Sequence, residues 1–437
     1  MKLETDVVVI GAGAAGLAAA HALSQAGVRV VVLEARTRIG GRLLTREDPE
    51  LPVPVELGGE FVHGTAEASF ALLRAAGSVA IDTAGSSFAY ENGELRDGAD
   101  PLNVVARVMR PACALHDDVS VDAFTRDIAP IDRRQALMMV EGFDAADPTR
   151  ASARAIAEEW DGDPDGQTSR QFRPLGGYAR LLRTLHGALD PQRVRVLLGT
   201  PVHTIRRGDR AVDVDATSAG DAPVAVRARA AIVTLPVGVL QSPVPAFEPP
   251  LPRVARDALA QLVMGPVVKL VLRFRSAFWE RLHDRRYLEA GFFHRAEAHF
   301  PTFWTLLPLR TPILVAWAGG PKADALAGLD ESGRVAAALD DLRVLFEGAD
   351  PAAELEAAYA HDWQADPYSR GAYSYVAVGG RGARSALAQP VDGLLFFAGE
   401  ATAGASEAGT VAGALQSADR VAAEVLAALG NASRSPR

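Results

Sequence analysis

The residues near the N-terminus follow the order strand, tight turn, helix, second strand and acid, which is the order of a dinucleotide-binding unit. Residues 7–10 are an apolar β-branched run, typical of a buried parallel strand. Gly11, Gly13 and Gly16 follow with GxGxxG spacing. The first glycine permits a tight turn, the second lets the backbone approach a pyrophosphate, and the third lets helix and strand pack closely. This unit predicts an α/β fold built on a Rossmann-like, mostly parallel sheet.

An acidic residue follows the second predicted strand, at the position where a dinucleotide-binding unit binds a ribose. We predict a helix over residues 17–25 and a strand over residues 28–33, after which comes Glu34, 18 residues beyond Gly16. A carboxylate at this place accepts hydrogen bonds from a ribose diol and disfavours a 2′-phosphate, so the unit favours FAD or NAD over NADP. A second glycine-rich segment, LFFAGEATAG, begins at Leu395 near the other end of the chain. We expect both ends to meet around one nucleotide, with the middle of the chain supplying a substrate site.

Composition narrows the class of protein. A chain of 437 residues exceeds what one core usually holds, so we expect two domains. The net charge of −9 argues against nucleic acid and anionic membranes as partners. Cys113 is the only cysteine, which fits a reducing, cytoplasmic location, and the nine histidines lack the spacing of metal ligands. No apolar stretch reaches the length of a membrane span.

The middle of the chain mixes helical and strand patterns, interrupted by polar segments rich in glycine and aspartate. We predict loops over residues 85–100 and 161–169. The predicted helices cover residues 70–76, 101–117, 131–139, 178–189, 333–346 and 408–428, and the predicted strands cover residues 194–198, 212–216, 231–235 and 267–274.

Eight motifs carry a resemblance that runs through most of the chain. They are VVVIGAGAAGLAAA, ARTRIGGRLLT, ELGGEFVHGT, PLGGYARLL, IVTLPVGVL, GPVVKLVLRF, DPYSRGAYSY and FFAGEATAG. Their order resembles that of the flavin-dependent amine oxidases, which include monoamine oxidases, polyamine and spermine oxidases and lysine-specific histone demethylases. The nucleotide motifs are shared with FAD-linked desaturases and protoporphyrinogen oxidases, so they do not by themselves establish amine chemistry.

The resemblance implies an FAD-binding domain of the GR2 type, discontinuous in sequence, with an α+β substrate-binding domain inserted into it. We assign residues 1–80, 190–248 and 388–431 to the first domain and residues 81–189 and 249–387 to the second. Residues 432–437 are expected to be a flexible tail.

The resemblance also implies which residues hold FAD. Arg42 would contact the pyrophosphate, Glu400 the polar chain of FAD, and Val202 the adenine through its backbone. Thr410 and Val411 open the last predicted helix, whose N-terminal dipole would face the flavin edge that gains negative charge on reduction. The full predicted set is Gly11, Gly13, Gly16, Glu34, Arg36, Gly41, Arg42, Gly59, Glu60, Val202, Gly399, Glu400, Thr410 and Val411.

Three residues are predicted to be catalytic. Lys269 lies in an apolar strand pattern, where an ammonium is costly without a partner, and in the family a lysine here assists flavin reoxidation through a water. An edge-strand lysine that reaches solvent is the alternative. Tyr373 matches the aromatic residue that frames the substrate amine. His63 could hydrogen-bond a secondary amine, and Glu60 could pair with a distal cationic nitrogen. A structural histidine and a capping glutamate are equally open readings of the last two.

The substrate site predicted in this way consists of Glu60, His63, Tyr373 and Thr410, whereas Trp304 and Trp363 are predicted to be core aromatics. Ala372 and Thr410 stand where monoamine oxidases have the flavin-linked cysteine and a second tyrosine, so FAD should be bound non-covalently. The motif ELGGEFVHGT lacks the arginine with which L-amino-acid oxidases usually hold the substrate carboxylate, and this argues against amino acids as substrates.

The implied reaction is hydride transfer from the α-carbon of a deprotonated amine to flavin N5, hydrolysis of the imine to an aldehyde, and reoxidation by O₂ to H₂O₂. Polyamine-like substrates are favoured, and a homodimer is possible. Two alternatives stay open at this point: an FAD-dependent desaturase of an apolar substrate, and a flavin-binding module without turnover.

Overall fold

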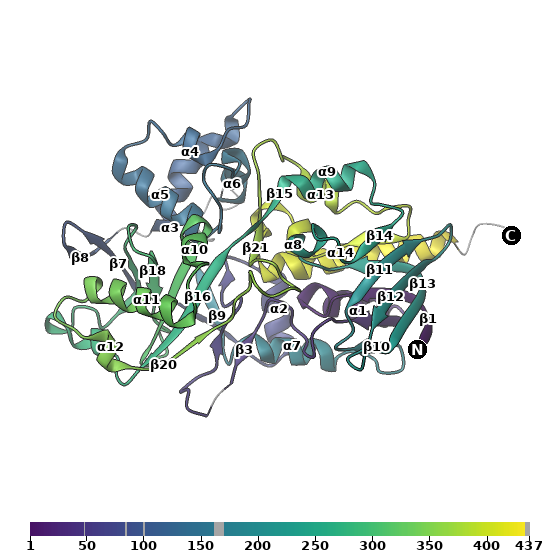
Figure 1. Ribbon diagram of the computed structural model, residues 1–437, viewed down its shortest axis with the longest axis horizontal. Helices are drawn as coiled ribbons and strands as arrows, with labels where there is room; N and C mark the ends of the chain where they lie inside the picture. The colour runs from purple at the N-terminus through teal and green to yellow at the C-terminus, as the bar shows by residue number, and fades with distance from the viewer. Residues whose placement is uncertain (48, 84, 99–100, 161–169, 433–437) are drawn as a thin grey trace.

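An eight-stranded sheet contains strands from both ends of the chain (Figure 1). The computed structural model describes residues 1–47, 49–83, 85–98, 101–160 and 170–432. The strand order is β10-β2-β1-β13-β12-β11-β14, with β22 paired to β13. These strands are β1 (Lys2–Ile10), β2 (Val30–Leu33), β10 (Val194–Leu197), β11 (Val202–Arg207), β12 (Val212–Thr217), β13 (Pro223–Val233), β14 (Ala246–Glu248) and β22 (Leu395–Phe397).

The core of this sheet is parallel, as predicted for a Rossmann-like fold. Strand β1 pairs in parallel with β2 and β13, and β22 pairs in parallel with β13. Alternate residues of β1 pack on opposite faces: Val7 and Val9 lie in one apolar cluster, and Val8 and Ile10 lie in the other. Because both faces are covered there, β1 is continuously apolar over residues 7–10. This confirms the predicted fold class.

Helices cover both faces of the sheet. The first face packs against α1 (Ala14–Gln25), α2 (Glu67–Ala75), α7 (Tyr178–Gly187) and α14 (Val411–Ala432). The second face packs against α8 (Val237–Leu240), α9 (Arg253–Gln261) and α13 (Ala383–Leu387). The N-terminal helix α1 and the C-terminal helix α14 contact each other directly, so the two ends of the chain do meet.

A second sheet has seven strands in the order β20-β16-β19-β18-β17-β7-β8. They are β7 (Ser86–Glu91), β8 (Glu94–Asp97), β16 (Val267–Phe274), β17 (Ala290–His294), β18 (Thr302–Trp304), β19 (Ile313–Gly319) and β20 (Leu355–Ala360). One face packs against α10 (Gly320–Leu326) and α11 (Glu331–Leu345), and α12 (Pro351–Glu354) follows α11. Val268 and Leu270 of β16 lie on that face, so the two-residue period directs Lys269 to the opposite face.

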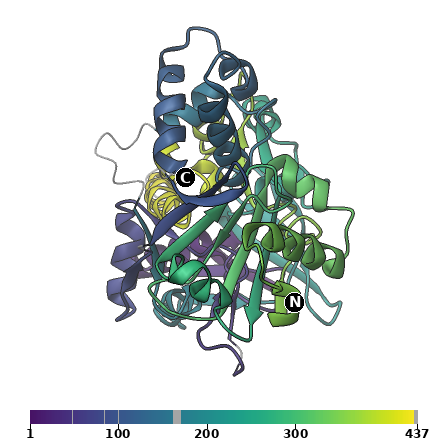
Figure 2. The ribbon, with the colours of Figure 1, turned by 90° about the vertical axis from the view of Figure 1, so that its left-hand side faces the viewer.

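A group of helices completes the second half of the molecule and stands above the second sheet in Figure 2. It contains α3 (Pro101–Met109), α4 (Val121–Phe124), α5 (Pro130–Gly142) and α6 (Ala153–Trp160). Three small sheets join the larger units: β3 (Thr45–Arg46) with β4 (Val55–Glu56), β15 (Leu262–Gly265) with β21 (Tyr373–Val376), and β5 (Val62–His63) with β9 (Gln171–Pro174) and β6 (Ala80–Asp82). Short 3₁₀ turns occupy Arg110–Ala114, Phe278–Arg281, His283–Arg285, Glu400–Thr402 and Ala405–Glu407.

Two local predictions were wrong. Residues 85–100 were predicted to be a loop, but β7 and β8 form a hairpin there, turning at Asn92 and Gly93 with φ of 51° and 90°. Asn-Gly favours a two-residue hairpin turn because both residues tolerate positive φ. The helix predicted over residues 101–117 ends at Met109 and continues as the 3₁₀ turn, since Pro111 has no N–H to donate.

The strands of the first sheet fall within residues 1–80, 190–248 and 388–431, and those of the second within residues 81–189 and 249–387. The exact domain boundaries stay a prediction. The loop predicted over residues 161–169 lies outside the described residues. Of the tail predicted over residues 432–437, only Ala432 is described, and it is the last residue of α14.

Candidate active site

A cavity of about 980 Å³ runs between the two sheets and is lined by residues from both. The structure places every predicted site residue except Gly16 in its lining. That set is Gly11, Gly13, Glu34, Arg36, Gly41, Arg42, Gly59, Glu60, His63, Val202, Lys269, Tyr373, Gly399, Glu400, Thr410 and Val411. Gly16 lies behind the cavity wall, where a Cβ would come within 2.0 Å of the Gly11 carbonyl oxygen. It therefore serves the close packing of helix on turn.

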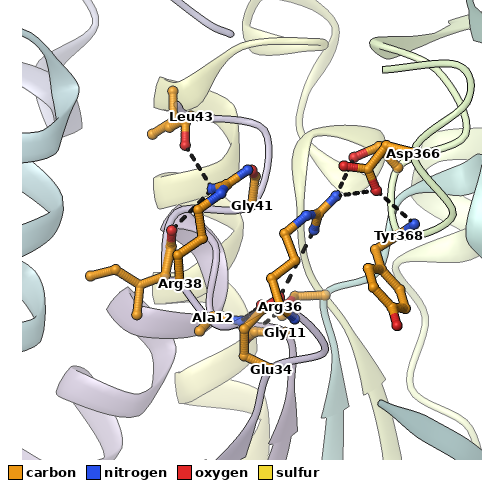
Figure 3. Close-up of polar contacts among 12 residues, drawn as sticks. Gly11, Ala12, Glu34, Arg36, Arg38, Gly41, Leu43, Asp366 and Tyr368 are labelled. Atoms are coloured by element: carbon orange, nitrogen blue, oxygen red, sulfur yellow. Dashed lines mark hydrogen bonds and ion pairs between the residues drawn. The ribbon is translucent and has the colours of Figure 1, made fainter. Parts of the chain in front are cut away.

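The first glycine-rich turn lines the cavity, and Figure 3 shows Gly11 and Ala12 of this turn beside Glu34. The buried Glu34 carboxylate accepts hydrogen bonds from the backbone N–H of Ala12 at 2.7 Å and of Arg36 at 2.9 Å. These bonds fix the acid beside the turn. Helix α1 begins after Gly13 without a side-chain cap, so its first N–H groups stay available for an anion. The arrangement fits the ribose and pyrophosphate of a dinucleotide.

Arg36 is held by a loop from the other half of the chain, which sequence reasoning missed. Its guanidinium contacts the Asp366 carboxylate at 2.7 Å and the Ser369 hydroxyl at 2.8 Å, and it lies over the Tyr368 ring (Figure 3). Burial raises the pKa of Asp366, but hydrogen bonds from His361 and Arg36 outweigh this and keep that pKa well below its usual range. Through these contacts Arg36 holds the segment around Tyr368 next to the first glycine-rich turn.

Arg38, also absent from the predicted set, supports the second glycine turn. It donates to the backbone carbonyls of Ile39, Gly41 and Leu43, with distances of 2.9 to 3.2 Å (Figure 3). The neighbouring Gly40 N–H donates to Ala12 at 2.8 Å. The two glycine turns are thereby held against each other on the cavity wall.

Arg42 and Glu400 form an ion pair of 2.9 Å that joins the two ends of the chain. Arg42 also donates to the Ala372 carbonyl at 2.7 Å, and Glu400 accepts from the Ser374 hydroxyl at 2.8 Å. Both side chains line the cavity. Arg42 is therefore bound at the cavity wall and is not a solvated surface arginine.

Helix α14 starts at the cavity. Thr410 caps it, because its hydroxyl accepts from the Gly413 N–H at 3.0 Å and donates to the Glu407 carbonyl at 2.8 Å. The helix begins at Val411 rather than at residue 408, since Ala405–Glu407 form a 3₁₀ turn. The positive end of the helix dipole thus faces the cavity.

Lys269 is buried and paired. Its ammonium donates to the Glu60 carboxylate at 2.7 Å and to the Gly58 carbonyl at 3.1 Å. Glu60 is also bound by Arg173 at 2.5 Å and by the Trp304 indole at 3.1 Å. Burial by itself raises the pKa of Glu60. The charges and hydrogen bonds of Lys269 and Arg173 outweigh this effect and lower that pKa to about 2. One carboxylate thus forms ion pairs with two cations.

This arrangement bears on the prediction that Glu60 meets the substrate. Among the described residues, Arg173 and Trp304 occupy its Oε1, and Lys269 occupies its Oε2. Glu60 is therefore the counter-ion of Lys269 in this structure. Its contact with a substrate stays a prediction.

Aromatic side chains line the part of the cavity around Tyr373. The Tyr373 hydroxyl donates to the Phe143 carbonyl at 2.6 Å, and the His63 ring meets the Phe143 ring edge-on, with centroids 5.1 Å apart. Burial lowers the pKa of His63 to about 4, so its imidazole is neutral at physiological pH. Trp304 and Trp363 belong to the core, at 4% and 3% exposure, yet both also line the cavity.

Within the described residues, no group of three metal-ligating side chains gathers in one place. No helix in that part of the chain is both long and apolar enough to cross a membrane.

Comparison with known proteins identifies the family. A model of the flavin containing amine oxidoreductases matches residues 112–426, and a model of an NAD(P)-binding Rossmann-like domain matches residues 9–76. Lysine-specific histone demethylase 1 homolog 3 of Arabidopsis thaliana is 29% identical over 97% of this chain, which spans 30% of that protein. Probable polyamine oxidase 4 of the same plant is 28% identical, covering 92% of this chain and 83% of its own.

The fold has a close counterpart among solved structures. A double mutant of putrescine oxidase, made in a redesign of its cofactor binding, superposes with a TM-score of 0.83 at 25% identity, covering 98% of this chain and 100% of the other. Together with the paired glycine turns and the buried lysine, these matches show that the chain is an FAD enzyme that belongs to the flavin-containing amine oxidoreductase family.

Proposed function

We propose that this enzyme is an oxidase of small amines. It oxidises the carbon next to the amine nitrogen, the resulting imine hydrolyses to an aldehyde, and dioxygen is reduced to H₂O₂. The observation that carries the proposal is the Lys269–Glu60 pair, which lies in the same cavity as Tyr373 and both glycine turns. FAD, when bound, supplies the chemistry of accepting two electrons from the amine and passing them to oxygen.

The chain's own residues prepare the site for this reaction. The hydroxyl of Tyr373 is anchored on Phe143, which fixes the orientation of the ring that would frame the amine. The neutral imidazole of His63 adds no positive charge beside a substrate amine. Lys269 keeps an ammonium in a buried position, where a fixed charge stabilises a developing negative charge more strongly than in water.

We propose that FAD is held without a covalent bond. Ala372 offers no thiol at the position where monoamine oxidases carry the flavin-linked cysteine. The single cysteine, Cys113, lies in the 3₁₀ turn after α3 and does not line the described cavity. The cofactor would then depend on Glu34, Arg42 and Glu400.

The experiment that tests the function is an anaerobic titration of the purified yellow protein with polyamines, diamines and aromatic monoamines. Bleaching of the flavin absorption by one class shows amine-to-flavin electron transfer and identifies the substrate class. If no amine bleaches a flavin that dithionite reduces, the proposal is wrong, and a desaturase of an apolar substrate takes its place.

The pH dependence of turnover should follow the substrate rather than the protein. Because burial lowers the pKa of His63 to about 4, this imidazole stays neutral from mildly acidic to alkaline pH and contributes no titration there. The value of kcat/KM should therefore rise with pH as the free amine loses its proton, and amines of different pKa should shift the rising limb accordingly. A limb fixed at one pH for all amines would show instead that an enzyme group controls it.

A further inference from the structure

Arg173 is a partly buried cation next to the cavity lining. It lies on β9, and its side chain is 11% exposed. Its guanidinium donates to the Glu60 carboxylate at 2.5 Å and to the backbone carbonyls of Thr305 and Leu307, each at 3.1 Å. The guanidinium also lies over the Phe61 ring, 4.6 Å from the ring centroid. Arg173 is therefore held in one position by groups on several sides.

The charges that meet at Glu60 do not cancel. Arg173 bonds its Oε1, and Lys269 bonds its Oε2 at 2.7 Å. Burial raises the pKa of Glu60, but the two cations outweigh this effect, so the carboxylate is ionised at physiological pH. Two positive charges and one negative charge leave one positive charge uncompensated.

Without Arg173, the charge of Lys269 would be cancelled by Glu60. An ammonium and a carboxylate in contact form a dipole, whose field falls off with distance faster than the field of a single charge. Glu60 and Lys269 line the cavity, whereas Arg173 is not among the described residues of its lining. Arg173 therefore acts on the cavity through Glu60, by sharing the carboxylate with Lys269.

Glu56 is a further acid that acts electrostatically on both Lys269 and Glu60. Burial raises the pKa of Glu56 to about 7, although the Tyr178 N–H and the Thr45 hydroxyl donate hydrogen bonds to its carboxyl. Below that pH, Glu56 is mainly protonated and leaves the uncompensated charge in place. Above it, Glu56 becomes a carboxylate and offsets part of this charge.

We propose that Arg173 is a positioning residue for the reaction with dioxygen, because it prevents Glu60 from fully neutralising Lys269 and so leaves a positive charge at the cavity. This inference rests on the proposed function. In the oxygen reaction the reduced flavin loses two electrons, and dioxygen takes them up with two protons to become H₂O₂. Negative charge that develops on dioxygen is stabilised by a fixed, uncompensated positive charge in a buried site. The same charge favours the electron-rich reduced flavin and raises its reduction potential.

The test uses FAD-loaded enzyme reduced with dithionite, so that it needs no amine. Arg173→Gln removes the charge, and Arg173→Lys keeps it. Arg180→Gln is the control, because this exposed arginine on α7 also donates to two backbone carbonyls, those of Ala76 and Gly77, and does not line the described cavity. The reduction potential of the flavin and the rate of its reoxidation by oxygen are measured at about pH 6, below the pKa of Glu56.

Arg173→Gln should slow reoxidation by about tenfold, less than the effect expected for Lys269 itself, because the charge of Arg173 lies farther from the cavity. It should also lower the reduction potential by about 30 mV, which corresponds to a tenfold change in the equilibrium of a two-electron couple. Arg173→Lys should keep both quantities near those of the unmodified enzyme, and Arg180→Gln should leave both unchanged.

An unchanged potential and oxygen rate in Arg173→Gln, with FAD bound, would overturn the inference. Losses in Arg173→Lys as large as those in Arg173→Gln would also overturn it, because they would show that the shape of arginine matters and its charge does not. Arg173→Met, whose apolar chain can still pack on Phe61, provides the same measurement if Arg173→Gln does not fold. None of these results bears on amine oxidation, which the anaerobic titration of the unmodified enzyme tests separately.

Discussion

Replacing Lys269 with methionine should slow the reaction of the reduced enzyme with dioxygen by about a hundredfold, the effect of removing one preorganised charge from a buried position in an active site. Lys269 is 3% exposed, and its ammonium is fixed by Glu60 and Gly58. Methionine has a similar length and keeps the strand β16 packed. The rates of flavin reduction by amine and of flavin reoxidation by oxygen, measured separately by stopped flow, give the result.

Two controls make this prediction specific. The rate of flavin reduction under anaerobic conditions should change by only a few-fold in Lys269→Met. Lys322→Met, on α10 and outside the described cavity lining, should leave both rates unchanged. An unaltered oxygen reaction in Lys269→Met, with FAD fully bound, would show that the lysine has only a structural role.

Replacing Glu60 with glutamine should destabilise the folded holoenzyme by about 3 kcal/mol, the range for breaking a buried ion pair by removing one partner. The change leaves the buried Lys269 and the partly buried Arg173 without the carboxylate that pairs with both. Urea unfolding at saturating FAD measures the loss. Glu47→Gln removes an exposed ion pair with Arg183 and should cost no more than about 1 kcal/mol.

A double variant identifies the source of that loss. If the unpaired ammonium of Lys269 causes much of it, adding Lys269→Met to Glu60→Gln should destabilise less than the sum of the two single changes. Strict additivity would mean that the two side chains do not interact energetically. A Glu60→Gln protein as stable as the unmodified one would contradict the counter-ion role.

The nucleotide half of the fold could be predicted because its chemistry is local in sequence. The turn at Gly11, the close packing of Gly16 and the acid Glu34 follow one another within a single unit, and each has one physical task. The hairpin at Asn92 and Gly93 could also have been predicted, because Asn-Gly favours a two-residue turn. The polar composition around it led to the prediction of a loop instead.

Other features depend on contacts between distant residues. Arg36 and its partner Asp366 are 330 positions apart, and Glu60 meets Lys269 over 209 positions, so no local pattern indicates either pair.

The most direct test of the central claim, amine-to-flavin electron transfer, is the endpoint of the anaerobic titration. One equivalent of a substrate amine per flavin should bleach the flavin absorption completely, release one equivalent of aldehyde, and leave a protein whose colour returns on admission of air with one equivalent of H₂O₂. A flavin that stays oxidised with every amine, although dithionite reduces it, would contradict the claim.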